Sequence, residues 1–556
     1  MKKYIIFGLM VACCSACSSW LEPAEDNYRT DEIVWSLPSY AEGVLLNGYR
    51  EMPTNYDWED AASDDLLHAN AGYKYSRMAL GQWASNDDQF SYWKKGYKAI
   101  YYINLFLENF EKTEYSWISA EQDSLHRQRL RGEAHALRAW WYAELLKRHA
   151  GESVSGELLG VPIIDYTISS ADDWNLPRNT MQECVAFILE DCQMAIDNLP
   201  DRYTDTGETD WDATLGARWK NRFNGLAAKA LKARVALLAA SPAFNPSNDQ
   251  TKWAEAAEYA AEVIQADGGI SNLSANGLHF WTLDNENDHE IIYRERRREG
   301  KGREQDAYPP SLFGNRGYLN PSHNLVSAFG DANGFPLSGD LTYNYNGRDP
   351  RLAAYIVYNG NTLRGTPINT TAISSDGLGK VNATLTGYYL KKLLNEQVNL
   401  DPQNASNSQH NMCYFRMTEM FLAFAEAANE AYGPDGAEPK TGFTARQAMS
   451  AIRTRAGLPQ ADAYMNSLTG TEDFRTLVRN ERRVELCFEG FRFYDLRRWK
   501  SQNMFEDITA VDISAIGEVE VISAQERPYE EFMFYGPIPY SETLKMSELD
   551  QNKGWM

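Results

Sequence analysis

The sequence predicts a mainly α-helical protein in which a helical scaffold carries a separate loop-rich region. Several segments of the 556-residue chain place small or apolar residues at intervals of three and four, which puts them on one face of a helix. Alanine is frequent on these faces and lets neighbouring helices approach closely. The stretch from Gly268 to Gln409 lacks long helical periods and is rich in Gly, Asn, Pro and Tyr. We therefore expect tetratricopeptide-like hairpins beside loops and short strands.

The first strongly periodic segment begins at Arg131 and ends at Gly151, a residue that favours helix termination. Its expected inward positions are Ala134, Leu137, Trp141 and Leu145. An alanine-rich helix follows (NGLAAKALKARVALLAASP) and stops at Ser241-Pro242. Further helices are expected at 253–265, 417–432, 444–455 and 471–490. Helices of this length joined by short turns resemble tetratricopeptide hairpins, although no period of about 34 residues is present.

Two irregular regions interrupt the helices. One runs from Tyr49 to Trp93, and the other is the stretch from Gly268 to Gln409. Both are rich in aromatic residues, and the second contains runs such as YPPSLFGNRGYLNP that are typical of turns and short strands. Ligand contacts usually come from irregular segments held on a rigid frame. Trp281, which lies next to Phe280, is expected in the core instead.

The segment 481–500 (ERRVELCFEGFRFYDLRRWK) concentrates charge and aromatic rings in a short stretch. On a helix, Glu481, Glu485 and Glu489 share one stripe. Arginine pairs with carboxylates through two parallel hydrogen bonds and stacks on rings, so we expect a structural ion-pair network whose partners include Arg453 and Arg455. Ligand contact and catalysis are the alternative roles for this segment.

The N-terminus carries an export signal. Two lysines precede a short apolar run (YIIFGLMVA) that is too short to span a bilayer as a stable helix. Small residues then lead to Cys17, as in a bacterial lipobox, where the cysteine is lipidated and becomes the mature N-terminus. We expect a lipoprotein signal peptide at 1–16. An ordinary signal peptide with incidental cysteines is the alternative.

Few cysteines follow the expected signal peptide. Those after Cys17 are Cys184, Cys192, Cys413 and Cys487. Four cysteines are too sparse for a disulfide scaffold, and their spacing fits no zinc site. We expect buried small hydrophobic residues, with a single disulfide as the alternative.

The net charge and the missing motifs argue against several classes of function. A formal charge of −23 repels phosphate backbones, so nucleic acid is not an expected partner. The segment His289 to Tyr293 begins like a zinc-protease helix but lacks the second histidine. A calcium site in the acidic run 284–290 is only a minor alternative, because the run lacks the loop spacing. A hydrolytic pair of carboxylates remains open, since sequence cannot show such a pair. We expect no metal and no cofactor.

The order of motifs along the chain resembles the RagB/SusD family of outer-membrane nutrient-uptake lipoproteins. The motifs are CSSWLEP, GEAHALRAWWYAELLKRHAG, LPRNTMQECVAFILEDCQMAI, AAKALKARVALLAASPAFN, NPSHNLVSAFGDANG, RDPRLAAYIVYNG, GYYLKKLL, FRMTEMFLAFAEAANEA, AIRTRAGLP, the segment 481–500 and YGPIPYSE. His135-Ala136 and Lys553 depart from the family pattern at packing or terminal positions.

The resemblance implies a mainly helical, SusD-like domain at 17–556 after the signal peptide. Its expected parts are a helical scaffold at about 30–267 and 410–500, a ligand-facing loop region at about 268–409, and a C-terminal segment at 501–556. The family binds oligosaccharides, or in some cases peptides, and sits on a SusC-like TonB-dependent outer-membrane transporter without catalysing a reaction. The resemblance therefore implies a lipid-anchored outer-membrane protein that faces the cell exterior.

A neutral sugar binds through an apolar ring that stacks on its C–H face and through planar polar groups that bond its hydroxyls. The two irregular regions offer that mixture. The expected ligand contacts are Asp64, Tyr73, Tyr75, Trp83, Arg296, Tyr308, Phe313, Arg316 and Tyr318. The leading hypothesis is a glycan-binding lipoprotein that delivers oligosaccharide to its transporter. A peptide-binding member of the same family, an anchored glycoside hydrolase and a purely structural lipoprotein are the alternatives.

Overall fold

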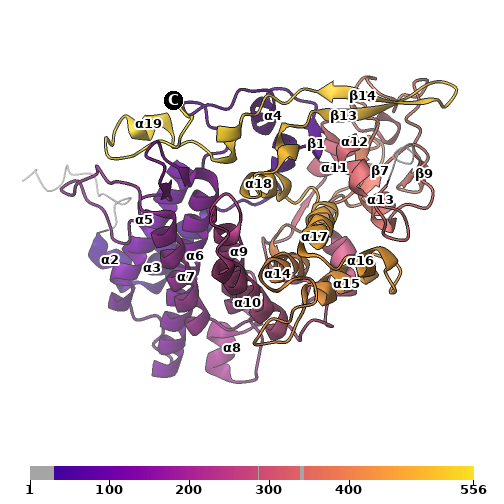
Figure 1. The fold of residues 1–556 in the computed structure, drawn as a ribbon. Helices are drawn as coiled ribbons and strands as arrows, with labels where there is room; N and C mark the ends of the chain where they lie inside the picture. Colours follow the sequence, from indigo (N-terminus) through magenta and orange to yellow (C-terminus); the bar gives the residue numbers. More distant parts are fainter. Residues whose placement is uncertain (1–29, 286, 338–343) are drawn as a thin grey trace, which may run out of the picture.

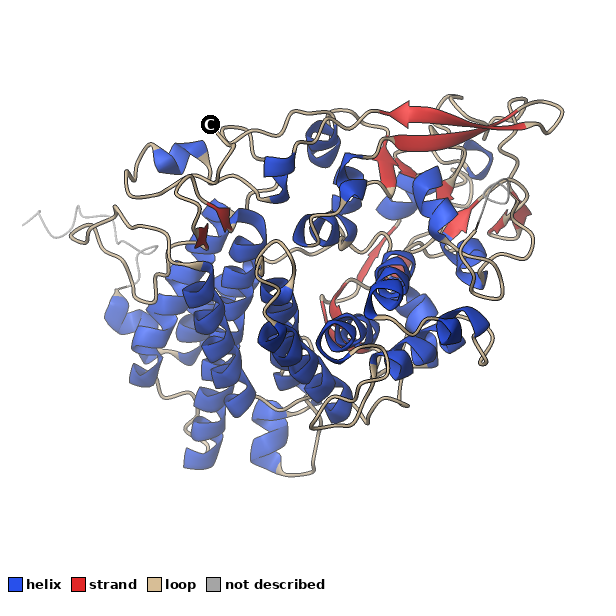
Figure 2. Cartoon of the chain, viewed as in Figure 1, coloured by secondary structure: helices blue, strands red, loops and turns tan. Residues whose placement is uncertain are grey.

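The structure, a computed structural model, describes residues 30–285, 287–337 and 344–556. The expected signal peptide and Cys17 lie outside the described residues. Helices fill one side of the molecule, and loops with short strands gather on the other side and along the top in the view of Figures 1 and 2. The predicted fold class, a helical scaffold with a loop-rich region of short strands, is confirmed.

The scaffold helices pack mostly in chain order. Those of the first half are α2 (Asp31–Ser36), α3 (Pro38–Arg50), α5 (Trp93–Asn109), α6 (Ala120–His149), α7 (Met181–Asn198), α8 (Thr209–Leu215), α9 (Gly225–Ala240) and α10 (Gln250–Ala266). Those of the second half are α14 (Met417–Tyr432), α15 (Ala445–Arg455), α16 (Ala463–Ser467), α17 (Thr471–Glu485) and α18 (Arg492–Arg498). Successive helices pack on one another from α5 to α7 and from α9 to α10, as hairpin arrays do.

The loop-rich region is an insertion between two helices that are neighbours in space. Helices α10 and α14 pack directly against each other although more than a hundred residues separate them in the chain, and Figure 1 shows them side by side. The alanines of α9 are buried on almost every side because α7, α10 and α14 all contact this helix. The scaffold is therefore continuous, and the inserted region lies outside it.

Helix α6 begins at Ala120, eleven residues before the predicted start at Arg131. The Ser119 side chain caps it by accepting a hydrogen bond from the Gln122 N–H at 2.9 Å. Its first turns carry mostly polar residues, so no apolar stripe marks them in the sequence. The cap, and not hydrophobic periodicity, sets this boundary.

Short antiparallel strand pairs tie the loops together. The pairs are β1 (Leu66–His68) with β6 (Leu319–Pro321), β2 (Gly151–Glu152) with β3 (Leu158–Leu159), β4 (Ile291–Arg294) with β12 (Cys413–Arg416), β5 (Arg298–Gly300) with β11 (Ser408–His410), β7 (Ile356–Val357) with β10 (Tyr389–Leu390), β8 (Thr362–Leu363) with β9 (Thr366–Pro367) and β13 (Ile508–Ile513) with β14 (Val519–Gln525). Short helices lie among them: α4 (Lys74–Ala79), α11 (Gly302–Ala307), α12 (His323–Ala328), α13 (Pro350–Tyr355) and α19 (Tyr540–Thr543).

Two hydrophobic cores result, one between the scaffold helices and one beneath the loops. Trp281 belongs to the second core, as predicted, and its indole N–H donates to the Leu394 carbonyl at 2.8 Å. The cysteines Cys184, Cys192 and Cys487 are buried and free, and Cys413 is free but half-buried. In the described part of the chain, no helix is long and apolar enough to cross a bilayer.

The segment 481–500 forms the predicted structural ion-pair network. Glu485 lies between the guanidinium groups of Arg351 and Arg455, at 3.0 and 2.7 Å. Burial alone would raise the pKa of Glu485, but Arg455, Arg351 and Arg416 outweigh it and lower that pKa to about 2. Glu481 pairs with Arg351 and Arg453 in the same way. The network joins α13, α15 and α17, so it fixes the loop region onto the scaffold.

Candidate functional site

Strand pairing brings the two predicted aromatic regions together. Strand β1 comes from the first region and β6 from the second, with His68 opposite Leu319. The pairing continues past the strands, where the Ala69 N–H donates to the Tyr318 carbonyl at 2.9 Å. Segments about 250 residues apart are therefore joined by one strand pair.

The side chains on this surface form an aromatic cluster. The His68 ring stacks on Tyr73, with centroids 4.0 Å apart and planes 17° apart, and lies 5.1 Å from Tyr318 on another side. Arg316 lies over the Tyr318 ring at 6.0 Å and pairs with Asp306 at 2.7 Å. We use the term aromatic face for Tyr73, Phe313, Arg316 and Tyr318.

Phe313 is the most exposed member of the aromatic face, with 52% of its surface accessible. Its backbone is left-handed, with φ of 62°, which is uncommon for a bulky residue and often marks a functional constraint. The preceding turn is closed by the Gly314 N–H, which donates to the Pro309 carbonyl at 3.1 Å. The turn thus holds the ring in solvent, although a buried position would be more favourable for it.

A hydrogen bond to Asp57 fixes the position of Tyr73. Its hydroxyl donates to the Asp57 carbonyl at 2.5 Å, and burial followed by the Asp57 charge raises its pKa above the usual value. Burial lowers the pKa of His68 to about 4, so this imidazole is uncharged at neutral pH. The half-buried Tyr73 ring is therefore backed by an uncharged imidazole, and His68, which is buried, supports that ring from within.

Four of the predicted ligand contacts are wrong because their side chains are buried. A side chain that does not reach the surface cannot contact a ligand there. The first two come from the segment around β1. Asp64 is fully buried, where Arg483 and Arg492 outweigh the effect of burial and lower its pKa. Tyr75 is fully buried and its hydroxyl donates to Glu59 at 3.0 Å. Asp64 holds the loop to the scaffold, whereas Tyr75 fixes the loop internally.

Trp83 and Tyr308 are the other two corrections. Trp83 packs 4.8 Å from Trp555 and its indole N–H donates to Asp88 at 2.8 Å. Tyr308 is fully buried, and its hydroxyl donates to the Asn395 carbonyl at 3.3 Å. Aromatic composition cannot separate such core rings from surface rings, because both occur in the same loops.

Arg296 is exposed in the link between β4 and β5. No contact among the described residues joins it to the aromatic face. Tyr73, Arg316 and Tyr318 are thus the predicted residues that the structure brings together at a surface, around His68. Phe313 precedes Arg316 in the same link and is exposed.

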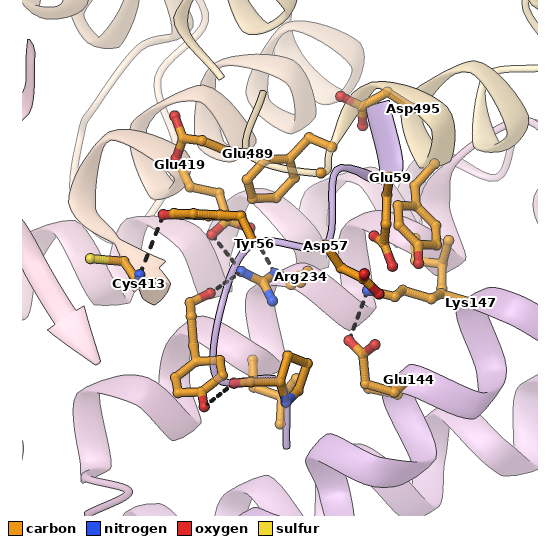
Figure 3. Close-up of a pocket in the computed structure, with 18 of the residues that line it drawn as sticks. Tyr56, Asp57, Glu59, Glu144, Lys147, Arg234, Cys413, Glu419, Glu489 and Asp495 are labelled. Atoms are coloured by element: carbon orange, nitrogen blue, oxygen red, sulfur yellow. Dashed lines mark hydrogen bonds and ion pairs between the residues drawn. The ribbon is translucent and has the colours of Figure 1, made fainter. Parts of the chain in front are cut away.

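Sequence reasoning missed a cavity of about 180 Å³ that lies between the scaffold and the segment 53–59. Helices α6, α9, α14, α17 and α18 contribute to its lining. Figure 3 shows Arg234 near the middle of these side chains, with Tyr56 and Glu419 beside it. Asp57 belongs to the lining and also accepts from Tyr73, so the cavity adjoins the base of the aromatic face. Its residues come from distant helices, and no local pattern could have revealed them.

A second hollow of about 580 Å³ lies among polar residues of the loop region, including His279, Lys391, Glu396 and Gln409. The indole in its lining, Trp281, is only 3% exposed. His279, which is exposed, is the accessible ring of this lining, so the hollow offers an imidazole in place of the phenyl and phenol rings of the aromatic face.

Within the described ranges, no group of three or more His, Cys, Asp or Glu side chains is arranged to hold a metal ion. In the acidic run 284–290, Asp288 instead accepts hydrogen bonds from Ser274 at 2.9 Å and Asn276 at 2.6 Å. This carboxylate serves the local fold.

Two family models together match most of the chain. The model described as the SusD family matches residues 280–555, and the model described as starch-binding associating with outer membrane matches residues 20–237. A curated relative, SusD-like protein P25 of Formosa agariphila, is 22% identical over 542 residues, which is 90% of each chain.

Solved structures share the fold along almost the whole chain. A SusD-like protein from Bacteroides fragilis has a TM-score of 0.76 and 25% identity, over 96% of this chain and all of that one. A SusD-like carbohydrate-binding protein from the same species has a TM-score of 0.70 and 20% identity, over 93% and 99% of the chains. A laminarin-binding SusD-like protein has a TM-score of 0.59 and 20% identity over the same shares.

Proposed function

Because the chain belongs to the SusD family, we propose that it captures an oligosaccharide on the aromatic face and delivers it to a TonB-dependent outer-membrane transporter. The protein is in this proposal a binding protein and not an enzyme. Lipidation at Cys17 would hold it on the outer membrane, facing the cell exterior. The family description of association with the outer membrane and the names of two structural relatives, which state carbohydrate or laminarin binding, support this assignment.

The observation that carries the proposal is the aromatic face itself. The exposed Phe313 ring and the half-buried rings of Tyr73 and Tyr318 offer apolar surfaces for the C–H face of a sugar. Arg316 and Asp306, paired at 2.7 Å, place a donor fork and an acceptor at the edge of these rings. Rings plus planar polar groups at one exposed surface are the combination that a neutral sugar requires.

Affinity electrophoresis of the full chain against a panel of soluble polysaccharides tests the proposal. We expect at least one polysaccharide to retard the protein, and the retardation to fall about tenfold or more in Tyr318→Ala and in Phe313→Ala. Tyr540→Ala is the matched control, because Tyr540 is an exposed tyrosine outside the aromatic face. Binding to peptides together with no binding to any polysaccharide would contradict the glycan assignment and favour the peptide-binding alternative.

Two further experiments test the alternatives in which the protein is an enzyme or a purely structural lipoprotein. Release of reducing sugar by the purified protein, abolished by a single carboxylate-to-amide change, would contradict the non-catalytic assignment. Co-purification with a transporter without affinity for any ligand would indicate a purely structural lipoprotein. For the anchor, Cys17→Ala is expected to move the protein from the membrane fraction to the soluble fraction.

A further inference from the structure

The hollow of about 580 Å³ in the loop region has the size of a ligand pocket. Pockets that hold drug-sized ligands occupy about 300–1,000 Å³, and the hollow falls within that range, whereas the cavity beside the segment 53–59, of about 180 Å³, falls below it. No residue of its lining belongs to the aromatic face, so the hollow is a separate surface. The lining comes from the 3-10 helix η4 (Ala275–Thr282), the links on either side of β4, α13, the link that follows β10, and β11.

Hydrogen bonds tie the segments around the hollow to one another. The Asn395 side chain donates to the Ser408 Oγ at 2.7 Å and to the Gln409 carbonyl at 3.2 Å, which joins the link after β10 to β11. The Trp281 indole joins η4 to the same link, because its N–H donates to the Leu394 carbonyl. A site that is already formed loses less free energy on binding, since few loops have to be ordered.

Three planar polar side chains of the lining are free to bond a ligand. Within the described ranges, the hydrogen bonds of Gln397, Gln409 and His279 involve only their main chains. Gln397 and His279 are exposed, and Gln409 is half-buried. A carboxamide offers an acceptor oxygen and a donor NH₂ group in one plane. Two such groups at the edge of one hollow suit a ligand that carries several hydroxyl groups.

The charged groups of the hollow balance one another. Arg297 pairs with Asp284 at 2.6 Å, and Lys391 lies 3.7 Å from Glu396. Burial, followed by the charge of Lys391, lowers the pKa of His279 below its ordinary value of 6.5, so the imidazole is mainly uncharged at neutral pH. The lining therefore favours a ligand without net charge.

We propose that this hollow is a second carbohydrate site, which holds a neutral segment of a polysaccharide. Sugar hydroxyls bond the carboxamides of Gln397 and Gln409, and a sugar ring lies against the imidazole of His279. The choice of a carbohydrate rests on the proposed function, whereas the preference for a neutral, hydroxyl-rich ligand comes from the lining itself. Where one polymer reaches both the hollow and the aromatic face, the two sites together bind it more tightly than either site alone.

Affinity electrophoresis of the full chain in laminarin, soluble starch, galactomannan and anionic alginate tests this proposal. A double variant with Gln397→Ala and Gln409→Ala removes both carboxamides and leaves the two ion pairs in place. We expect it to lower the retardation by at least one neutral polysaccharide about fivefold or more, because the second point of attachment is lost. Gln403→Ala is the matched control, since Gln403 is an exposed glutamine of the same loop region outside the lining, and its retardation should equal that of the wild type.

Ala354→Phe tests the same site without removing a polar group. Ala354 is a half-buried residue of α13 in the lining, and a phenyl ring at this position occupies part of the hollow. We expect the same loss of retardation as in the double variant. An unchanged circular dichroism spectrum shows that the variant is folded.

Tyr318→Ala, on the aromatic face, separates this proposal from the proposed function. Adding the two glutamine changes to Tyr318→Ala should remove the retardation that remains in Tyr318→Ala alone. Unchanged retardation of both hollow variants by every polysaccharide, with a loss in Tyr318→Ala, would overturn the second site and leave the proposed function in place. A loss in the hollow variants but not in Tyr318→Ala would support the second site and contradict the assignment of binding to the aromatic face.

The anionic polysaccharide tests the chemistry of the ligand. A loss of retardation that the hollow variants show with alginate alone would overturn the neutral ligand. If none of the four polysaccharides retards the wild-type protein, both the second site and the proposed function are wrong.

Discussion

At the scale of single residues, the buried Asp60 departs furthest from ordinary carboxylate behaviour. Burial, together with the nearby charge of Asp65, raises its pKa to about 8. Its Oδ2 accepts the Gly490 N–H at 2.9 Å, whereas its Oδ1 has no partner among the described residues. We therefore expect Asp60 to hold its proton in the folded state at neutral pH, whereas in the unfolded chain it ionises near the ordinary aspartate pKa of 3.8.

Asp60→Asn is expected to stabilise the protein at pH 8 more than at pH 5. The folded state holds the Asp60 proton up to about pH 8. The contribution of Asp60 to the free energy of unfolding of the wild-type protein therefore falls as pH rises from 3.8 to 8. Asparagine resembles the protonated acid and removes that loss. Thermal unfolding followed by circular dichroism at both pH values measures the difference, and an equal change at both would contradict the raised pKa.

Arg482→Ala is expected to lower the free energy of unfolding by no more than about 3 kcal/mol, because Asp495 loses one of its two arginine partners. The retardation of the folded protein by polysaccharide should not change, since Arg482 pairs with Asp495 and packs on Phe491, and neither residue belongs to the aromatic face. Chemical denaturation gives the first quantity and affinity electrophoresis gives the second. Unchanged stability with lost polysaccharide binding would reverse the assignment of the segment 481–500.

At the scale of elements, the β1–β6 pair is what creates the proposed glycan site. Neither strand is longer than three residues, and each lies in a loop region that is irregular by itself. Their pairing fixes His68 between Tyr73 and Tyr318, and the link from α11 to β6 adds Phe313 and Arg316. The geometry of that link decides how the rings are presented.

Gly317→Ala is expected to weaken polysaccharide binding about tenfold. Gly317 has φ of 56°, and a Cβ there would lie 2.5 Å from the Asn382 carbonyl oxygen, so the link must shift next to Tyr318. Affinity electrophoresis measures the effect. Gly379→Ala is the matched control, because Gly379 also has a positive φ, of 70°, but a Cβ there meets nothing within 4 Å. Equal losses in both variants would show that backbone strain alone is responsible.

At the scale of the whole molecule, buried ion pairs join the loop region to the scaffold. Glu485 on α17 pairs with Arg351 of the loop region, and neighbouring Arg charges outweigh the opposing effect of burial and lower its pKa to about 2. Glu144 and Glu426, whose partners lie within the scaffold, have pKa values lowered to about 2 for the same reason. Breaking one such pair leaves a buried charge without compensation, which is costly. The two parts of the molecule therefore depend on the same charges, and we expect them to unfold together.

Acid is expected to unfold the protein progressively below about pH 6.5. His68 and His323 have pKa values lowered to about 4 from 6.5 by burial, so the unfolded chain takes up their protons first and stability falls as pH drops through this interval. The three glutamates add a further loss of stability between the ordinary glutamate pKa of 4.5 and about 2. Melting temperatures recorded from pH 7 to pH 3 measure this, and a constant value down to pH 3 would contradict it.

Local sequence patterns determined the scaffold. The periodic segments became α6, α9, α10, α14, α15 and α17, because an amphipathic or alanine-rich stretch of that length has few other ways to bury its apolar atoms. The arginine and glutamate density of 481–500 likewise predicted a buried network, since charges of both signs at helical spacing find partners nearby. The loop regions and the identity of Tyr73, Phe313, Arg316 and Tyr318 as candidates also came from the sequence.

Only the tertiary structure decided which loop residues reach the surface. Tyr75, Trp83 and Tyr308 are aromatic like the rings of the aromatic face, yet they lie in the second core, and Asp64 is buried beside Arg483 and Arg492, because burial depends on which distant segment covers a residue. The cavity beside the segment 53–59 is a still clearer case, as its lining includes residues of five helices, of strand β12 and of the segments 53–59 and 488–491. Helical periodicity is a property of neighbouring residues and can be read from them, whereas a binding surface is formed by segments that meet only when the chain folds.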